Sequence, residues 1–99
     1  MAMGNDDNRK IARDSLFVMA ELRVDGIEGD HRVRIRNLSP GGLMAEGNVQ
    51  VWRGHGIWVN LPKLGWIEGA VAWVQDNRFG VAFRDQIDSR VAIASAQSA

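Results

Sequence analysis

The sequence predicts an all-β protein, a small six-stranded antiparallel β-barrel. Three observations support this prediction. Hydrophobic and polar residues alternate in about six short segments, as expected for strands with one buried face. Gly, Asp, Asn and Pro separate these segments, and they are the usual residues of turns. A sheet built from only 99 residues buries its core best by closing on itself, which also removes its unpaired edges.

The first two predicted strands cover residues 16–24 and 31–38. In "LFVMAELRV" one face carries only hydrophobic residues, namely Leu16, Val18, Ala20, Leu22 and Val24. In "HRVRIRNL" Val33 and Ile35 lie on one face, and the other face carries Arg32, Arg34 and Arg36. The segment "DGIEGD" (25–30) between the strands is rich in Gly and Asp and predicts a turn.

Four more strands are expected at 43–46, 55–62, 65–75 and 79–83, with a hairpin turn at "DNR" (76–78). Each of the last three should place a hydrophobic set on one side. These sets are Ile57, Val59 and Leu61, then Ile67, Val71 and Trp73, then Phe79, Val81 and Phe83. The four tryptophans are expected mostly in the core and at the mouth of the barrel.

The predicted domain organisation has three parts. Residues 1–13 are polar and without periodicity, which favours a flexible N-terminal arm. Residues 14–84 would form the barrel. The tail, residues 85–99, could begin a short helix with Asp85 or Asp88 as its cap.

Composition excludes several functions. Twelve basic and twelve acidic residues give a formal net charge of +0, so a general nucleic-acid binder is not expected. The chain contains no cysteine, which excludes disulfides and thiolate metal sites. No segment has the composition of a signal peptide or the length of a membrane span. We therefore expect a cytoplasmic protein.

Catalysis is not expected. The only histidines, His31 and His55, lack the spacing of metal ligands, and the carboxylates are scattered over turns. There is no phosphate-binding loop of the Walker type and no dinucleotide fingerprint. The sequence thus predicts neither an enzyme nor a bound metal or cofactor.

Two short motifs carry the candidate binding chemistry. "RKIAR" places Arg9 and Arg13 four residues apart, and "NLSPGG" places Asn37, Ser39 and Gly42 at a strand end. The planar fork of arginine suits phosphates and the O6/N7 edge of guanine. Asparagine and serine offer short donors and acceptors, and glycine permits a close backbone approach or a positive φ. Two arginines on one short arm could therefore hold a purine and a phosphate together. Taken separately, the motifs favour simpler interpretations, because an arginine pair in a polar arm is usually solvated surface charge and "NLSPGG" is most often an ordinary turn.

The order and spacing of these motifs resemble the PilZ domain family of bacterial cyclic di-GMP receptors. The family pattern RxxxR followed by (D/N)xSxxG corresponds to Arg9-x-x-x-Arg13 and Asn37-x-Ser39-x-x-Gly42. Downstream, "WVNLP", "EGAVAWVQ" and "RFGVAF" are similar to the later strands of the family. The resemblance covers about residues 9–84.

The resemblance implies a six-stranded barrel whose RxxxR arm folds over cyclic di-GMP. Arg9 and Arg13 would contact guanine edges and phosphates, Asn37 and Ser39 would read a guanine edge, and Gly42 would shape the turn. Lys10 and Gly41 lie within the two motifs and are further candidates for ligand contact. Trp73 falls where some members place an aromatic ring against a guanine. The output would be a changed surface offered to an effector protein in the bacterial cytoplasm, controlling motility, adhesion or biofilm formation.

Two alternatives remain open at this point. The chain could be a PilZ-type adaptor that acts on a protein partner without ligand. It could also be a barrel that binds single-stranded nucleic acid through Arg32, Arg34 and Arg36, although zero net charge argues against this. The partner, the number of ligands bound and the oligomeric state are not predicted.

Overall fold

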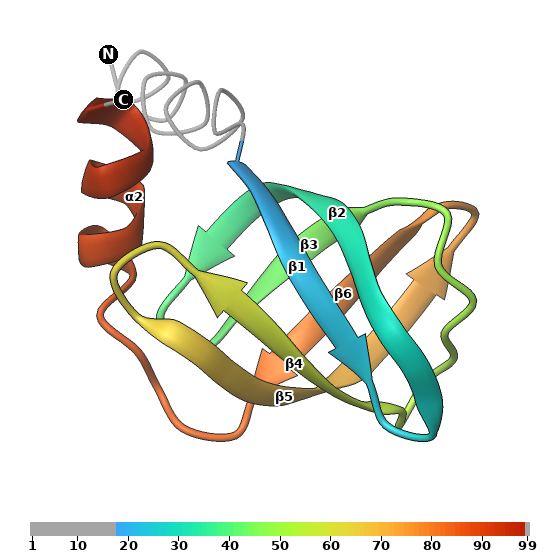
Figure 1. Cartoon of the computed structure of the whole chain (residues 1–99). Helices are drawn as coiled ribbons and strands as arrows, with labels where there is room; N and C mark the ends of the chain where they lie inside the picture. The colour runs from blue at the N-terminus through green and yellow to red at the C-terminus, as the bar shows by residue number, and fades with distance from the viewer. Residues whose placement is uncertain (1–17, 99) are drawn as a thin grey trace, which may run out of the picture.

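The chain forms a closed antiparallel barrel, described by a computed structural model for residues 18–98 (Figure 1). Around the barrel the strands follow the order β1-β2-β3-β6-β5-β4. The elements are β1 (Val18–Val24), β2 (Ile27–Ser39), β3 (Gly42–Glu46), β4 (Gly56–Leu61), β5 (Gly65–Gln75), β6 (Arg78–Phe83) and α2 (Ser89–Ser98). The predicted six-stranded antiparallel barrel is confirmed. The predicted N-terminal arm, residues 1–13, lies outside the described residues.

Short connections account for the antiparallel topology, because a two-residue turn can join only antiparallel neighbours. Such turns link β1 to β2, β2 to β3 and β5 to β6. The longer segment 47–55 carries the chain from β3 to β4. Pairing of residues 22–24 of β1 with residues 57–59 of β4 then closes the barrel.

The predicted turn over residues 25–30 is wrong. Only Asp25 and Gly26 form the turn, and β2 begins at Ile27. Gly26 has a φ of +84°, a backbone conformation that glycine adopts without strain. Beyond this turn Arg23 pairs with Asp30 across the two strands, and its Nε lies 2.7 Å from Oδ1 of Asp30. The pairing with β1 thus includes Ile27 and Asp30, and Glu28 and Gly29 are the extra residues of a register shift between them.

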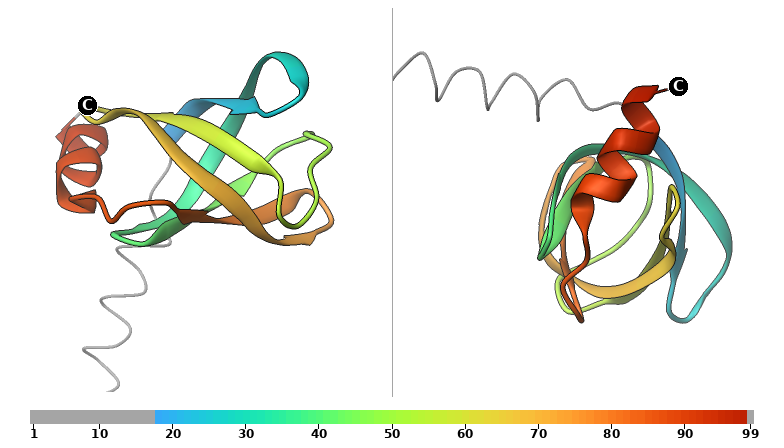
Figure 2. Two further views of the ribbon diagram at one scale, coloured as in Figure 1. Left: turned by 90° about the horizontal axis from the view of Figure 1, so that it is seen from below. Right: turned by 90° about the vertical axis from the view of Figure 1, so that its left-hand side faces the viewer.

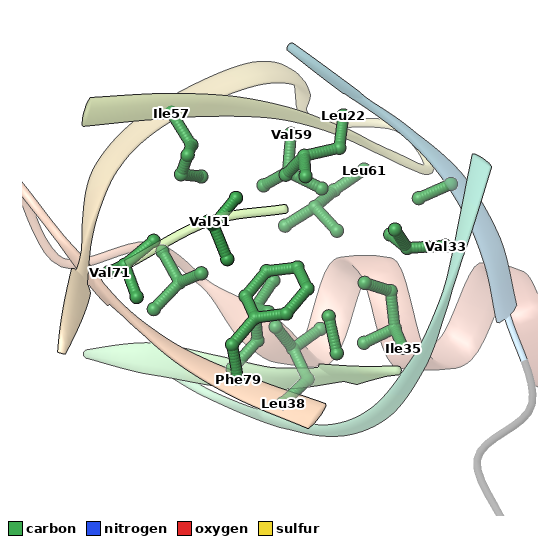
Figure 3. Close-up of a cluster of buried hydrophobic side chains, with 14 of the residues drawn as sticks. Leu22, Val33, Ile35, Leu38, Val51, Ile57, Val59, Leu61, Val71 and Phe79 are labelled. Carbon is green, nitrogen blue, oxygen red and sulfur yellow. The ribbon is translucent and has the colours of Figure 1, made fainter. Parts of the chain in front are cut away.

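The core fills the inside of the barrel with side chains from all six strands (Figure 3). Phe79 is the largest of the fully buried side chains and is 1% exposed. The hydrophobic sets predicted for residues 16–24, 55–62 and 79–83 face this core in all their described members, with Val18 and Phe83 at its edge, and Leu16 lies outside the described residues. Burial of a large aliphatic or aromatic side chain contributes about 1.5–3 kcal/mol, so this interior is the main source of stability.

Three register shifts occur in the described strands of the barrel, and two of them are single-residue β-bulges that reverse the alternation of faces, whereas the third, between Arg23 and Val24, is a shift of two residues and does not. Ile35 pairs with Ala45 and Asn37 with Met44, so Arg36 is an extra residue in β2. Likewise Val71 pairs with Val81 and Trp73 with Gly80, so Ala72 is an extra residue in β5. Each bulge reverses the faces of the residues that follow it.

The second bulge overturns the predicted position of Trp73. That residue was expected on the same side as Ile67 and Val71, but it points outward and is 40% exposed, whereas Val71 is 2% exposed. None of the four tryptophans lies in the core. Trp52 stacks on His55 with ring centroids 4.6 Å apart, and the Arg23 guanidinium lies 4.2 Å from the ring centroid of Trp66.

The C-terminal helix α2 crosses one end of the barrel (Figure 2). Ser89 and Ala92 face the barrel and are 6% and 2% exposed, and Ile93 packs against the core. Of the two predicted caps, Asp88 is correct, because its Oδ1 accepts a hydrogen bond from the Arg90 backbone N–H at 3.2 Å. Among residues 18–98, no helix combines the length and the hydropathy needed to cross a membrane.

The Asp88 cap should make α2 sensitive to acid. The Arg90 side chain donates hydrogen bonds to Asp88 and lowers its pKa from the ordinary value of 3.8. The Asp88 carboxylate therefore stabilises α2 fully above the pKa that Asp88 has in the unfolded chain. This stabilisation is lost as the pH falls through the lower pKa of Asp88 in the folded protein. We expect wild type to lose helical circular dichroism below pH 3.8 more steeply than D88N, because asparagine caps equally well without titrating.

D88A supplies the control, since it should weaken the helix even at neutral pH. Equal acid profiles for wild type and D88N would show that Asp88 does not carry this sensitivity.

Candidate functional site

The turn Pro40–Gly41 is held in place by its neighbours. Ser39 Oγ donates a hydrogen bond to the carbonyl oxygen of Gly42 at 3.2 Å. The backbone N–H of Phe83, at the end of β6, donates to the Gly41 oxygen at 2.9 Å. The N–H of Ile87, just before α2, donates to the Pro40 oxygen at 2.9 Å. The turn therefore has one defined shape and is connected to the segment that leads into α2.

Gly42 is required by close packing of two strands. A Cβ atom at this position would collide with the backbone carbonyl oxygen of Val81 in β6. The positive φ considered for Gly42 is not observed, since the described glycines with positive φ are Gly26, Gly29, Gly54 and Gly65. The adjacent Gly41 has open space around its Cα. The last glycine of the motif thus has a structural function that does not depend on a ligand.

Strand register brings Asn37 and Trp73 into one row on the outside of the barrel. Asn37 pairs with Met44, Met44 with Gly80, and Gly80 with Trp73. We call these four residues the tryptophan row. Both bulges are needed for it, because without them Asn37 and Trp73 would face the core. Next to this row Ser39 pairs with Gly42, and Gly42 with Ala82, so the neighbouring surface carries only small side chains.

The indole of Trp73 lies against the backbone of Gly80. A Cβ atom at Gly80 would collide with Nε1 and Cε2 of this indole. Gly80 is buried although it belongs to an outward-facing row, because the ring covers it. The absence of a side chain at residue 80 thus allows the ring to lie directly against the strand, and its exposed part offers an aromatic surface.

A surface hollow of about 520 Å³ lies beside the ring, and its volume is within the range of small-molecule sites. It is lined by Asn37, Ser39, Gly42, Leu43, Met44 and Trp73. The hollow therefore combines an aromatic ring, an amide, a hydroxyl and a thioether. Such a mixture can stack a base and hydrogen-bond its polar edge.

The charged groups next to the hollow are mainly arginines. Arg36 donates a hydrogen bond to Glu46 at 2.8 Å, with 31% and 24% of the two side chains exposed. This hydrogen bond lowers the pKa of Glu46, and the charges of Arg36, Arg78 and Arg34 lower it further against the opposing effect of burial. Three arginines therefore act on one carboxylate in the surface beside the hollow.

The structure brings together five of the predicted site residues: Asn37, Ser39, Gly41, Gly42 and Trp73. Gly41 is exposed at the tip of the turn but does not line the hollow. Arg9, Lys10 and Arg13 lie outside the described residues. Met44 and Gly80 were not predicted. The only sequence signal for Gly80 is a glycine in the middle of a predicted strand, which often marks a close approach.

Metal binding has no support in the part of the chain that the structure describes. Residues 18–98 contain no group of three or more His, Asp or Glu side chains able to hold an ion. The hollow likewise has no carboxylate in its lining.

These features define a small β-barrel domain with a polar turn and an outward tryptophan on one wall. The family model of the PilZ domain matches residues 7–95, and the chain belongs to the PilZ domain family. This is a family of ligand-binding and adaptor domains that is associated with cyclic di-GMP and is not known for enzymatic activity. No curated protein shows detectable sequence similarity to the chain.

Proposed function

We propose that the protein is a cytoplasmic bacterial receptor that binds cyclic di-GMP and passes the signal to an effector protein. The observation that carries the proposal is the tryptophan row beside the turn. It places Asn37, Ser39 and Trp73, which are up to 36 residues apart in the sequence, around one hollow of about 520 Å³. Family membership supplies the ligand class, and this surface has groups that suit it.

Each group has a chemical task in this proposal. Trp73 stacks on a guanine, and such base–aromatic contacts contribute about 1–3 kcal/mol. Asn37 offers an amide donor and acceptor to the polar edge of the base, and Ser39 offers a hydroxyl. Arg9 and Arg13 of the RxxxR motif bind the phosphates and a guanine edge through their planar forks. No further cofactor is required.

The signal has a physical route to a partner. Ligand contact at residues 39–42 acts on a turn whose two carbonyl oxygens are hydrogen-bonded to Phe83 and Ile87. Only Asp88 separates Ile87 from the start of α2. A displacement of the turn would therefore change how α2 sits on the barrel end, and with it the surface offered to an effector protein.

Single-stranded nucleic acid is less well supported as a ligand. Arg36 is hydrogen-bonded to Glu46, and Arg32 lies 4.0 Å from Glu21. Acidic residues thus offset much of the positive charge on which that alternative depends.

Calorimetric titration tests the proposal and its site together. We expect selective heat with cyclic di-GMP and none with GTP or cyclic GMP. N37A should weaken binding about tenfold through the loss of a base-edge hydrogen bond, without changing the unfolding midpoint.

E28A, on the far part of β2, is the control and should bind like wild type. Absence of heat and of thermal stabilisation with wild type would refute the receptor function and favour a ligand-independent adaptor.

A further inference from the structure

A second outward row lies next to the tryptophan row and belongs to neither motif. Arg34 pairs with Glu46, Glu46 with Arg78, and Arg78 with Gln75. These residues follow the same four strands as the tryptophan row, β2, β3, β6 and β5, which are consecutive around the barrel. We call them the arginine row.

Arg78 is close enough to the tryptophan row to share a ligand with it. Arg78 and Gly80 are two residues apart on β6, so both positions lie on the same face of the sheet, with their Cα atoms about 7 Å apart. The indole of Trp73 lies against Gly80. The Arg78 side chain, which is exposed and long, can therefore extend over the surface beside that ring. It does not line the hollow and stands just beyond it.

The charge of Arg78 is poorly compensated where it stands. Its cross-strand neighbour is Glu46, and this carboxylate is already hydrogen-bonded to Arg36 at 2.8 Å. Within residues 18–98 Arg78 itself makes no ion pair, in contrast to Arg23, Arg84 and Arg90. An arginine whose neighbouring carboxylate is engaged elsewhere remains available to an external anion.

We propose that Arg78 binds a phosphate of the nucleotide whose base stacks on Trp73, which makes the arginine row an anion subsite of the hollow. This inference rests on the proposed function. The ligand would then span three adjacent outward rows, with the turn at one side, the base on the tryptophan row and a phosphate on the arginine row. Gln75 at the end of the row offers an amide donor next to Arg78.

Four proteins titrated with cyclic di-GMP test the inference: wild type, R78A, R78K and R32A. R78A should weaken binding about tenfold through the loss of a charge-assisted contact. R32A removes the same charge from the β1–β2 side of the barrel, where the side chain is 68% exposed, and should change affinity by no more than about twofold. R78K should retain most of the affinity, because lysine serves a phosphate as a point charge but does not reproduce the forked contact with a guanine edge.

Salt and stability measurements complete the design. The difference in affinity between wild type and R78A should shrink at high ionic strength, because exposed charges are screened. All four proteins should share one unfolding midpoint, since both substituted residues are exposed. Equal affinities of R78A and R32A would overturn the inference, and so would a loss in R78K as large as in R78A. Failure of wild type to bind would overturn the proposed function and the inference together.

Discussion

Replacing Gly42 with alanine is expected to lower the free energy of unfolding by about 2–3 kcal/mol, the cost of overpacking a tightly packed position. The added Cβ would meet the carbonyl oxygen of Val81, a backbone atom that cannot turn aside as a side chain can. Relief requires β3 and β6 to separate, in a ladder where Gly42 pairs with Ala82 and Leu43 with Val81. Urea unfolding monitored by circular dichroism measures the loss.

Gly41 supplies a matched control one residue away. A Cβ atom there meets nothing within 4 Å, and its φ is not positive, so G41A should change stability by no more than about 0.5 kcal/mol. Equal unfolding curves for G42A and G41A would show that the strands accommodate the Cβ atom. The expected contrast would mean that the glycine of the NxSxxG motif supports the barrel whether or not a ligand binds.

Replacing Gly80 with alanine is expected to weaken cyclic di-GMP binding at least about tenfold while leaving the fold intact, because it displaces the aromatic surface on which we place the base. The Cβ would collide with the Trp73 indole, which is exposed on its outer side and can rotate away. The barrel therefore keeps its core, but the ring no longer lies against residue 80 beside the hollow. Titration calorimetry measures the affinity, and a parallel unfolding curve checks the fold.

A double-mutant cycle separates this effect from general damage. If Gly80 acts only through the ring, G80A should cost little in a W73A background, so the two losses should be strongly non-additive. Full additivity would show that residue 80 affects binding by another route. Near-ultraviolet circular dichroism gives an independent signal. G80A should change the tryptophan spectrum of the protein that contains Trp73 and should leave the spectrum of the W73A background unchanged, because the affected indole is absent there.

The strands of the barrel could be predicted because their pattern is local. Each strand buries every second residue, and this alternation is visible in "HGIWVNLP" and in "FGVAF" without knowledge of the partner strand. The polar turn at residues 39–42 could be predicted equally well, since Ser, Pro and Gly each favour turns through their own backbone or side-chain properties. The RxxxR and NxSxxG spacings, matched to a known family pattern, then predicted membership of the PilZ family.

The composition of the site depended on contacts between distant strands. Whether Trp73 faces the core or the solvent is set by the extra residue Ala72, and that bulge exists only in relation to the pairing with β6. The neighbours of the ring, Asn37, Met44 and Gly80, are likewise chosen by the register of three ladders. The sequence does not show which residues of two strands pair. A shift of the pairing by one residue leaves the sequence unchanged but moves every side chain of the strand to the opposite face of the sheet. Residue types and strand periodicity could therefore be read along the chain, whereas the surface formed by the hollow and the arginine row arises only when β2, β3, β6 and β5 pair in this register.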